Sequence, residues 1–385
     1  MSTLYSRLAT LSALAFAVSS LFVGCGGSGG NQKDEPDAPS VDEVAFARGA
    51  DVSWASEMEY DMTHNPSRIS GTAFKDSKGN AGLYPVLKAA GINAIRLRVW
   101  VKPEDPNGWS GKDDVVNMAK RAAEAGMSVM IDFHYSDFFA DPSRQNTPAE
   151  WAGLDLKGLS AKVAEHTKDV MTALKSAGVT PHWVQVGNET RPGMLWETGR
   201  LYNDKGDIPG GWSNYAALTT AGYDAVKSVF PDAQVIVHID NAYQDNTWFF
   251  DKLKANGGKF DMIGLSHYPM TNFQMTWKAM NSAAILNIKT LASKYGCKVM
   301  VCEVGVKASA SEIATSTQCL TDFMNSVKSL SVCAGVFYWE PQVDGKWRPA
   351  IYEKQGRNWG AYDMGAFTSD GSAITPTSIL SAFGE

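Results

Sequence analysis

The chain has 385 residues, of which 44% are hydrophobic and 20% are charged, and its formal net charge at pH 7 is −6. This composition is typical of a globular protein with enough apolar material for a large core. The sequence has no basic run or stripe. Nucleic acid and polyanionic substrates are therefore disfavoured as partners, and a neutral ligand fits the charge balance better.

The N-terminal segment reads as an export signal. Residues 1–24 hold one basic residue, Arg7, followed by an apolar stretch that is too short and too rich in small residues for a membrane span. Its end, LFVGC over 21–25, resembles a bacterial lipobox, in which cleavage leaves the cysteine to carry lipid. We expect a signal peptide over 1–24 and lipidation of Cys25; the alternative is an ordinary signal peptide with an incidental cysteine.

Residues 25–45 are rich in Gly and Ser and then acidic, which predicts a flexible tether. An acidic patch just after the lipid cysteine resembles signals that send lipoproteins to the cell surface in some Gram-negative bacteria. We therefore expect an exported lipoprotein of the outer membrane, held at the cell surface by its lipid anchor. We also expect the protein to be a monomer.

After the tether, apolar runs of strand length alternate with helical patterns eight times. Strands are expected near 49–54, 93–100, 128–135, 182–188, 233–239, 260–267, 298–304 and 333–339. Helices are expected around 82–90, 113–125, 157–177, 213–229, 245–256, 276–295 and 311–329, with a short closing helix near 376–383. This alternation predicts the α/β class, as a (β/α)8 TIM barrel that forms one catalytic domain over 46–385.

The segments that follow several of the strands are long and rich in aromatic residues. They cover 54–81, 136–156, 190–212 and 340–375. In a TIM barrel these segments build the face at the carboxyl ends of the strands, where active sites lie.

Two of the expected strands end on a glutamate. The run from 183 ends at Asn188-Glu189, and the run from 298 ends at Glu303. Cleavage of a glycosidic bond with retention needs two carboxyl groups about 5–5.5 Å apart, one as general acid/base and the other as nucleophile. The pair predicts a retaining glycosidase, and Asn188 is well placed to bind the sugar 2-hydroxyl.

Short motifs along the chain carry a family resemblance. They are GADVS at 49–53, RLRVW at 96–100, DFHYSD at 132–137, GNETRPGMLW at 187–196, HIDN at 238–241, SHYP at 266–269, CE at 302–303 and FYWEP at 337–341. Together they resemble the retaining barrel glycosidases with the acid/base on strand four and the nucleophile on strand seven. Within that clan the chain is similar to the endo-β-1,4-galactanases of glycoside hydrolase family 53, over about residues 47–375.

The resemblance implies that Glu189 is the acid/base and Glu303 the nucleophile. It also implies that an arginine of strand two lies beneath the nucleophile and keeps it ionised. Arg96 and Arg98 lie on the same face of that strand, and Arg98 is favoured because it is nearer the carboxyl end.

Other positions are expected to bind the sugar or to position the nucleophile. The resemblance implies such roles for His134, Asp240 and Tyr268, and makes Trp339 the aromatic surface beneath the cleaved sugar. Trp359 is a further candidate for stacking on sugar, because it lies in a loop rich in Gly and Asn.

Several polar residues have competing interpretations. Glu340 is a rival carboxylate that is expected to point away from the sugar. Asp132 is expected to pair with a barrel arginine, with substrate contact as the alternative. His134 and His267 could both be packed barrel histidines; a functional role is favoured for His134 and packing for His267. A metal could be ligated by Glu57, Glu59, Asp61 and His64 of segment 54–81, but a solvated loop face is favoured.

No cofactor or metal is predicted. Some bacterial relatives bind calcium between the loops after strands seven and eight, and Asp344 and Asp363 could supply oxygen ligands, but they are too scattered to predict a site. Among the cysteines, Cys297 and Cys333 each lie six residues before a landmark at the barrel mouth, which favours level positions on adjacent strands and a disulfide. The alternative is that all four cysteines of the domain are buried free thiols.

The sequence therefore predicts retaining endo-hydrolysis of β-1,4-galactosidic linkages in galactan or type I arabinogalactan. The choice of galactan depends on the resemblance alone. The alternatives are a β-mannanase or cellulase of the same clan, or a surface glycan-binding lipoprotein without catalytic activity.

Overall fold

The computed structural model describes residues 44–272, 274–354 and 363–384. The expected signal peptide, the lipidation site Cys25, most of the tether and Trp359 lie outside these residues. Within them, no helix combines the length and the apolar character that a bilayer span requires.

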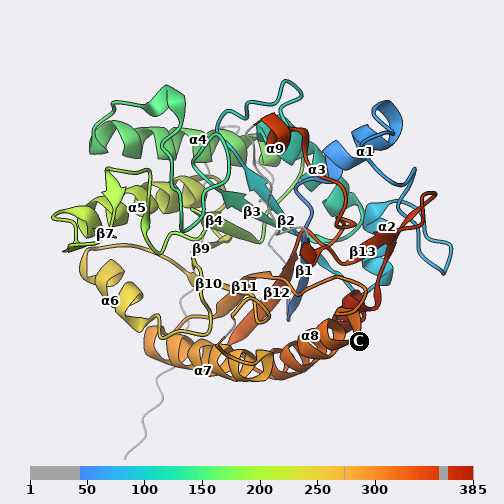
Figure 1. Cartoon of the computed structure of the whole chain (residues 1–385). Coiled ribbons are helices and arrows are strands. Elements are labelled where there is room, and N and C mark those ends of the chain that lie inside the picture. Colours follow the sequence, from blue (N-terminus) through green and yellow to red (C-terminus); the bar gives the residue numbers. More distant parts are fainter. Residues whose placement is uncertain (1–43, 273, 355–362, 385) are drawn as a thin grey trace, which may run out of the picture. The chain divides into compact units, whose positions relative to one another are not determined.

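Eight parallel strands close into a barrel in the order β1-β12-β11-β10-β9-β4-β3-β2. The strands are β1 (Ala47–Asp51), β2 (Ala94–Val99), β3 (Ser128–Phe133), β4 (Trp183–Val186), β9 (Gln234–Ile239), β10 (Met262–His267), β11 (Val299–Val304) and β12 (Cys333–Trp339). Each lies at the position that the apolar runs predicted. The TIM barrel is confirmed, and Figure 1 shows the helices around these strands.

The helices connect the strands as expected. They are α2 (Leu83–Ala89), α3 (Lys112–Glu124), α4 (Leu156–Ser176), α5 (Gly211–Val229), α6 (Thr247–Ala255), α7 (Trp277–Tyr295) and α8 (Ile313–Lys328). The closing helix is a 3-10 helix, η3 (Ser378–Phe383). Two short helices were not predicted, α1 (Ala55–His64) after β1 and α9 (Ala350–Lys354) after β12.

Smaller elements decorate the loops. The 3-10 helix η1 (Ala149–Trp151) follows β3, and two hairpins follow β4. These hairpins are formed by β5 (Gly193–Met194) with β6 (Gly199–Arg200) and by β7 (Tyr202–Asn203) with β8 (Gly206–Asp207). A third hairpin, β13 (Phe367–Ser369) with β14 (Ile374–Pro376), precedes η3. The loops at the carboxyl ends of β1, β3, β4 and β12 thus carry additional elements, and these are the four loops that the sequence predicted to be long.

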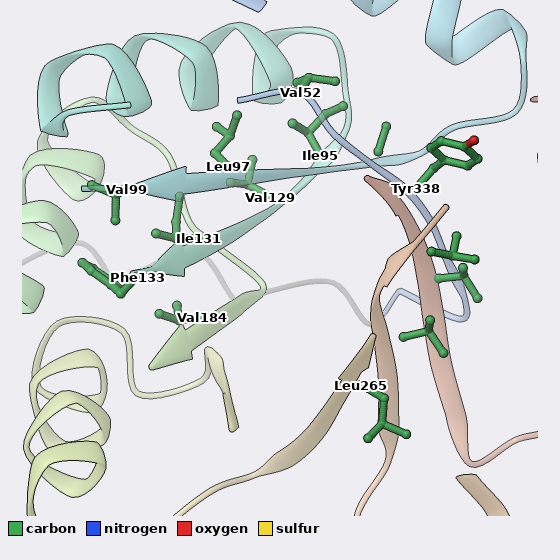
Figure 2. Packing of buried hydrophobic residues seen from close by; sticks show 14 of the residues in the cluster. Val52, Ile95, Leu97, Val99, Val129, Ile131, Phe133, Val184, Leu265 and Tyr338 are labelled. Carbon is green, nitrogen blue, oxygen red and sulfur yellow. The ribbon is translucent and has the colours of Figure 1, made fainter. Parts of the chain in front are cut away.

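The strands divide their residues between two apolar clusters. On β2, Ile95, Leu97 and Val99 belong to the large cluster shared with the helices, and Figure 2 shows them with the matching residues of β3 and β4. Ala94 belongs instead to a smaller cluster inside the barrel. Because strand side chains alternate between faces, Arg96 faces the barrel interior as Ala94 does.

A bulge in β11 turns Glu303 into the barrel. Val299 and Val301 pack toward the helices, so simple alternation would send Glu303 outward as well. The pairing with β10 slips by one residue here, so that Leu265 faces Val301 but Ser266 faces Glu303. The extra residue, Cys302, stays in the inner cluster. Bulges often re-aim a side chain next to an active site, and this one delivers Glu303 to the barrel mouth.

The predicted disulfide between Cys297 and Cys333 is wrong. All four cysteines that the structure describes are free. Cys333 is level with Val299 rather than with Cys297, and register shifts interrupt the pairing of β11 with β12. The prediction assumed unbroken two-residue periodicity down both strands, and the bulges remove that periodicity.

Candidate active site

A cavity of about 290 Å³ opens at the carboxyl ends of the barrel strands. Its lining residues are Arg96, Arg98, His134, Phe139, Ala140, Asp141, Asn188, Glu189, Tyr268, Thr271, Glu303, Trp339 and Met364. Seven of the predicted site residues are therefore in one cavity. Asp240 lines an adjoining cavity of about 220 Å³, together with Glu189, Ser266 and Tyr268.

The chain turns sharply after β4 to present Asn188 and Glu189. Gly187 has φ 107°, and a Cβ at this position would come within 2.6 Å of the Thr190 side chain. Glu189 itself has φ 47°, a conformation that is uncommon for a residue other than glycine. Thr190 secures the turn, because its backbone N–H donates to the carbonyl of His238 at 2.8 Å. As a result, two consecutive side chains reach the same cavity.

Glu303 is held by two donors. Arg96 Nη2 lies 3.0 Å from Glu303 Oε1, and the Tyr268 hydroxyl donates to Glu303 Oε2 at 2.7 Å. Only 5% of Glu303 is exposed, so both charge-assisted contacts act with little solvent screening. One carboxylate oxygen therefore faces the arginine and the other faces the tyrosine.

The arginine beneath Glu303 is Arg96, and the prediction of Arg98 for that place is wrong. Arg98 Nη1 pairs with Glu340 Oε1 at 2.7 Å instead. Its guanidinium lies over the rings of Trp54 and Phe139, with centroids at 4.3 and 4.6 Å. The two arginines do share one face, as predicted, but Glu303 lies level with Arg96, the one farther from the carboxyl end of β2.

Arg96 is the centre of a buried polar cluster. Its contacts are Asp51 Oδ2 at 2.7 Å, Asp132 Oδ2 at 2.8 Å, Asn188 Oδ1 at 2.8 Å, Gln185 Oε1 at 2.6 Å and the nearby Glu303 carboxylate. We call these six residues the Arg96 cluster. The prediction that Asp132 pairs with a barrel arginine is confirmed, and this arginine holds the pKa of Asp132 low, at about 2, despite burial.

The two glutamates differ in their electrostatic surroundings. Burial raises the pKa of Glu189 well above its ordinary value, and the charges of Glu303 and Asp240 raise it further. Burial also raises the pKa of Glu303, but Arg96 and the Tyr268 hydrogen bond act in the opposite direction. Glu303 therefore ionises first, while Glu189 retains its proton. This is the division that a general acid and a nucleophile require.

The remaining predicted residues lie around the two glutamates. His134 contacts Asp132 Oδ2 through Nε2 at 2.9 Å and accepts from the backbone N–H of Ala140 at 2.9 Å. Asn188 Nδ2 donates to the carbonyl of Ala140 at 2.8 Å. Asp240 receives two bonds from Arg191, at 2.5 and 2.9 Å. Each side chain is thus fixed by the protein at one end.

Two competing interpretations are decided by burial. Glu340 is 1% exposed and is taken up by Arg98 and Gln342, so it points away from the cavity as predicted. His267 is fully buried and its Nε2 lies 2.9 Å from Asn281 Oδ1, as expected for a packed histidine.

The interpretation of segment 54–81 as a solvated face is wrong for Glu57 and Asp61. Both lie on α1 and are at most 2% exposed. Glu57 Oε1 accepts the backbone N–H of Ala350 at 2.7 Å, and Asp61 Oδ2 accepts Trp347 Nε1 at 2.9 Å. These acids therefore fasten the loop after β12 to α1, a role for which the sequence contains no local signal.

No group of three or more His, Cys, Asp or Glu side chains suited to a metal ion occurs among the described residues. Asp344 and Asp363 do border one cavity, with Lys307 and Lys346 beside them. This arrangement neither supports nor contradicts calcium binding.

Three residues beside the glutamates were not singled out from the sequence. They are Gln185, His238 and Ser266, all at most 1% exposed, and they connect Arg96 to Glu189. His238 and Ser266 lie in the motifs HIDN and SHYP, which was the available signal.

Residues 47–380 match the model of Glycosyl hydrolase family 53. An arabinogalactan endo-beta-1,4-galactanase of Thermothelomyces thermophilus is 35% identical over 335 residues, covering 81% of this chain and 94% of the relative. An endo-beta-1,4-galactanase of Bacillus subtilis is 30% identical and covers 86% of this chain and 78% of the relative. A solved structure from a study of two fungal beta-1,4-galactanases superposes with a TM-score of 0.71 at 31% identity, over 88% of this chain and 99% of that one.

The family match covers most of the chain and nearly all of the barrel, and the two glutamates lie in the cavity at its mouth. The chain belongs to glycosyl hydrolase family 53.

Proposed function

We propose that this protein hydrolyses internal β-1,4-galactosidic linkages of galactan with retention, using Glu303 as nucleophile and Glu189 as general acid/base. The observation that supports it most is the asymmetry of the two carboxyls. Glu303 is bound by Arg96 and Tyr268, whereas Glu189 faces the carboxylates of Glu303 and Asp240. The choice of galactan as the substrate is inferred from the relatives that are named galactanases.

In the first step, a Glu303 carboxylate oxygen attacks the anomeric carbon while the bond to the leaving oxygen breaks. Glu189 gives its proton to that oxygen, so the leaving sugar departs as an alcohol and Glu189 becomes an anion. In the second step, Glu189 takes a proton from water, and the water oxygen displaces Glu303 from the anomeric carbon. The Glu303 carboxylate and the protonated Glu189 are regenerated.

The two adjoining cavities suit the two sides of the cleaved bond. Trp339 and His134 line the cavity that contains Glu303, where the sugar that forms the covalent intermediate binds. Asp240, Asn241 and Tyr243 line the cavity beyond Glu189. Because Glu189 protonates the leaving oxygen, that second cavity receives the leaving part of the chain.

The experiment is reducing-sugar release from galactan, mannan and cellulose by the soluble domain beginning near Val41. Release from galactan alone is expected. Preferential release from mannan or cellulose would replace the substrate assignment, and absence of release from all three would favour the glycan-binding alternative. The matched control is Glu303→Gln, which should bind galacto-oligosaccharides without cleaving them.

A separate proposal concerns location. We infer from the lipobox-like LFVGC segment that Cys25 carries lipid and holds the enzyme at the outer membrane, on the cell surface. The full chain should partition with membranes, and Cys25→Ser should move it to the soluble fraction with unchanged activity. Equal partitioning of both proteins would refute the anchor. Protease accessibility on whole cells would decide between the surface and the periplasmic side.

A further inference from the structure

A chain of buried polar side chains runs between Glu303 and Glu189 inside the barrel. Arg96, which contacts Glu303, also donates from Nε to Gln185 Oε1 at 2.6 Å. Gln185 Nε2 lies 2.8 Å from His238 Nδ1, and His238 Nε2 lies 2.9 Å from Ser266 Oγ. Ser266 and Glu189 line the same cavity, and hydrogen bonding from the Ser266 side chain acts to lower the pKa of the Glu189 carboxyl.

The direction of each hydrogen bond follows from the donors available. An arginine Nε can only donate, so the Gln185 atom facing it must be the carbonyl oxygen. The Gln185 amide NH₂ is then the group that faces His238 Nδ1. Since an amide NH₂ can only donate, Nδ1 must be the unprotonated nitrogen of the imidazole.

Other contacts of His238 Nδ1 agree with this assignment. The backbone N–H of Glu189 also points at Nδ1, at 3.4 Å. One acceptor, Asn188 Oδ1, lies 3.1 Å away, but it is occupied by Arg96 Nη2 at 2.8 Å. Two donors thus outweigh one acceptor that already has a partner.

The neutral imidazole must then carry its proton on Nε2. Burial and the nearby Arg96 lower the pKa of His238 well below its ordinary value, so the ring is neutral across the physiological range. Its Nε2–H donates to Ser266 Oγ. The serine oxygen is therefore used as an acceptor, and its single hydroxyl hydrogen is left for Glu189.

We propose that Ser266 is a positioning residue for the acid/base, and that Gln185 and His238 direct the serine hydroxyl hydrogen at the Glu189 carboxylate. This inference rests on the proposed roles of the two glutamates. The bond stabilises the anionic form of Glu189, which exists after proton donation and acts as the base in the second step. It counteracts the burial and the neighbouring carboxylates that favour the neutral form.

The test is the pH profile of kcat/KM for galactan in Ser266→Ala. Without the serine donor the Glu189 anion is less stable, so the basic limb of the profile should move to higher pH by about one unit. Ser266→Thr, which keeps a hydroxyl, should return the limb toward the wild-type position. An unmoved limb in Ser266→Ala, or an equal loss at every pH, would overturn the proposal.

Aryl galactosides with good leaving groups provide a second readout. They need little proton donation, so kcat/KM for these substrates should change less than about twofold in Ser266→Ala, whereas that for galactan falls further. Equal losses on both substrates would indicate a merely structural serine and would contradict the proposal.

A double-mutant cycle tests the relay through His238. Gln185→Glu replaces the donor to Nδ1 with an acceptor, so the imidazole proton should move to Nδ1 and the serine hydroxyl should turn to Nε2. The basic limb of the kcat/KM profile for galactan should move in Gln185→Glu. The shift should be smaller when Gln185→Glu is introduced in the Ser266→Ala background. Equal shifts in both backgrounds would mean that the new carboxylate acts directly and that no relay exists.

A measurement without substrate separates this inference from the proposed function. The Glu189 carboxyl can be titrated by ¹³C NMR, with its signal assigned by its loss in Glu189→Gln. A higher Glu189 pKa in Ser266→Ala than in the wild type is expected, and identical values would refute the inference even in an active galactanase. If wild type left galactan intact while the titration shifted, the proposed function alone would fail.

Discussion

Two arginines that lie two residues apart on β2 have different surroundings. The Arg96 cluster is polar, and three carboxylates and two amide oxygens surround one guanidinium. Arg98 pairs with the carboxylate of Glu340 and lies against aromatic rings. We call Arg98, Glu340, Trp54, Trp100 and Phe139 the Arg98 box.

The difference indicates that one arginine acts on the proposed reacting groups and that the other has a structural role. The Arg96 cluster is built from inward-facing residues of the barrel strands and the turn after β4, and it fixes the charge and the orientation of Glu303. The Arg98 box is completed by loops, since Trp54 packs edge-on against Trp347 and Tyr352 from the segment after β12. We propose that Arg96 acts on the reacting groups through Glu303 and that Arg98 organises the wall of the cavity.

The largest effect is expected from Arg96→Lys. An ammonium cannot reproduce the planar fork that reaches five acceptors, so buried carboxylates lose their partner. We expect the free energy of unfolding to fall by about 3 kcal/mol or more, and kcat/KM to fall by at least about 100-fold. Chemical denaturation and galactan turnover measure the two effects, and near-wild-type turnover would remove Arg96 from the mechanism.

A large effect on stability alone is expected from Glu57→Gln. Glu57 accepts the backbone N–H of Ala350, in the segment after β12 that packs against Trp54 of the Arg98 box. Burial raises the pKa of Glu57 to about 8, above the ordinary value of 4.5. The folded state therefore holds the proton more tightly than the unfolded state, and wild type loses stability as pH rises from about 4.5 to about 8.

The amide that replaces the carboxyl in Glu57→Gln cannot ionise, so this part of the pH dependence should vanish in the variant. At pH 7 the variant should be more stable than wild type by up to roughly 3 kcal/mol, the equivalent of two to three pKa units. Melting temperatures from pH 5 to 8 measure the difference. Parallel curves for the two proteins would show that Glu57 is ionised in the folded state.

The smallest effect is expected from Arg98→Lys, the same change as at Arg96. The ammonium keeps a charge opposite Glu340, but it loses the Arg98 Nε bond to Ser110 Oγ and the stacking on Trp54. We expect a loss of about 2 kcal/mol in stability and less than tenfold in kcat/KM. Equal losses of turnover in the two lysine variants would erase the distinction between the two regions.

The sequence predicted the barrel because each strand is a short apolar run bounded by turn residues, which is a local signal. It predicted Glu189 and Glu303 because both end such runs. It misplaced the arginine contact because Arg96 and Arg98 share a face, and only the strand register decides which one is level with Glu303.

Other features depend on partners far away in the chain. The bulge at Cys302 arises from how β11 pairs with both of its neighbours, so alternation within β11 alone predicts the wrong face for Glu303. Glu57 and Asp61 are buried because they bond Ala350 and Trp347, which lie 293 and 286 residues later in the sequence. Viewed without the segment that covers it, the sequence of α1 has the polar pattern of a solvent-exposed helix.

The most direct test of the central claim is the site of covalent labelling by an activated 2-deoxy-2-fluoro-galacto-oligosaccharide. The fluorine slows hydrolysis of the glycosyl-enzyme, so the intermediate accumulates and its peptide can be mapped by mass spectrometry. We predict one label, on the peptide that contains Glu303, and none in Glu303→Gln. A label on the peptide that contains Glu189 or Glu340 would contradict the assignment of Glu303 as nucleophile.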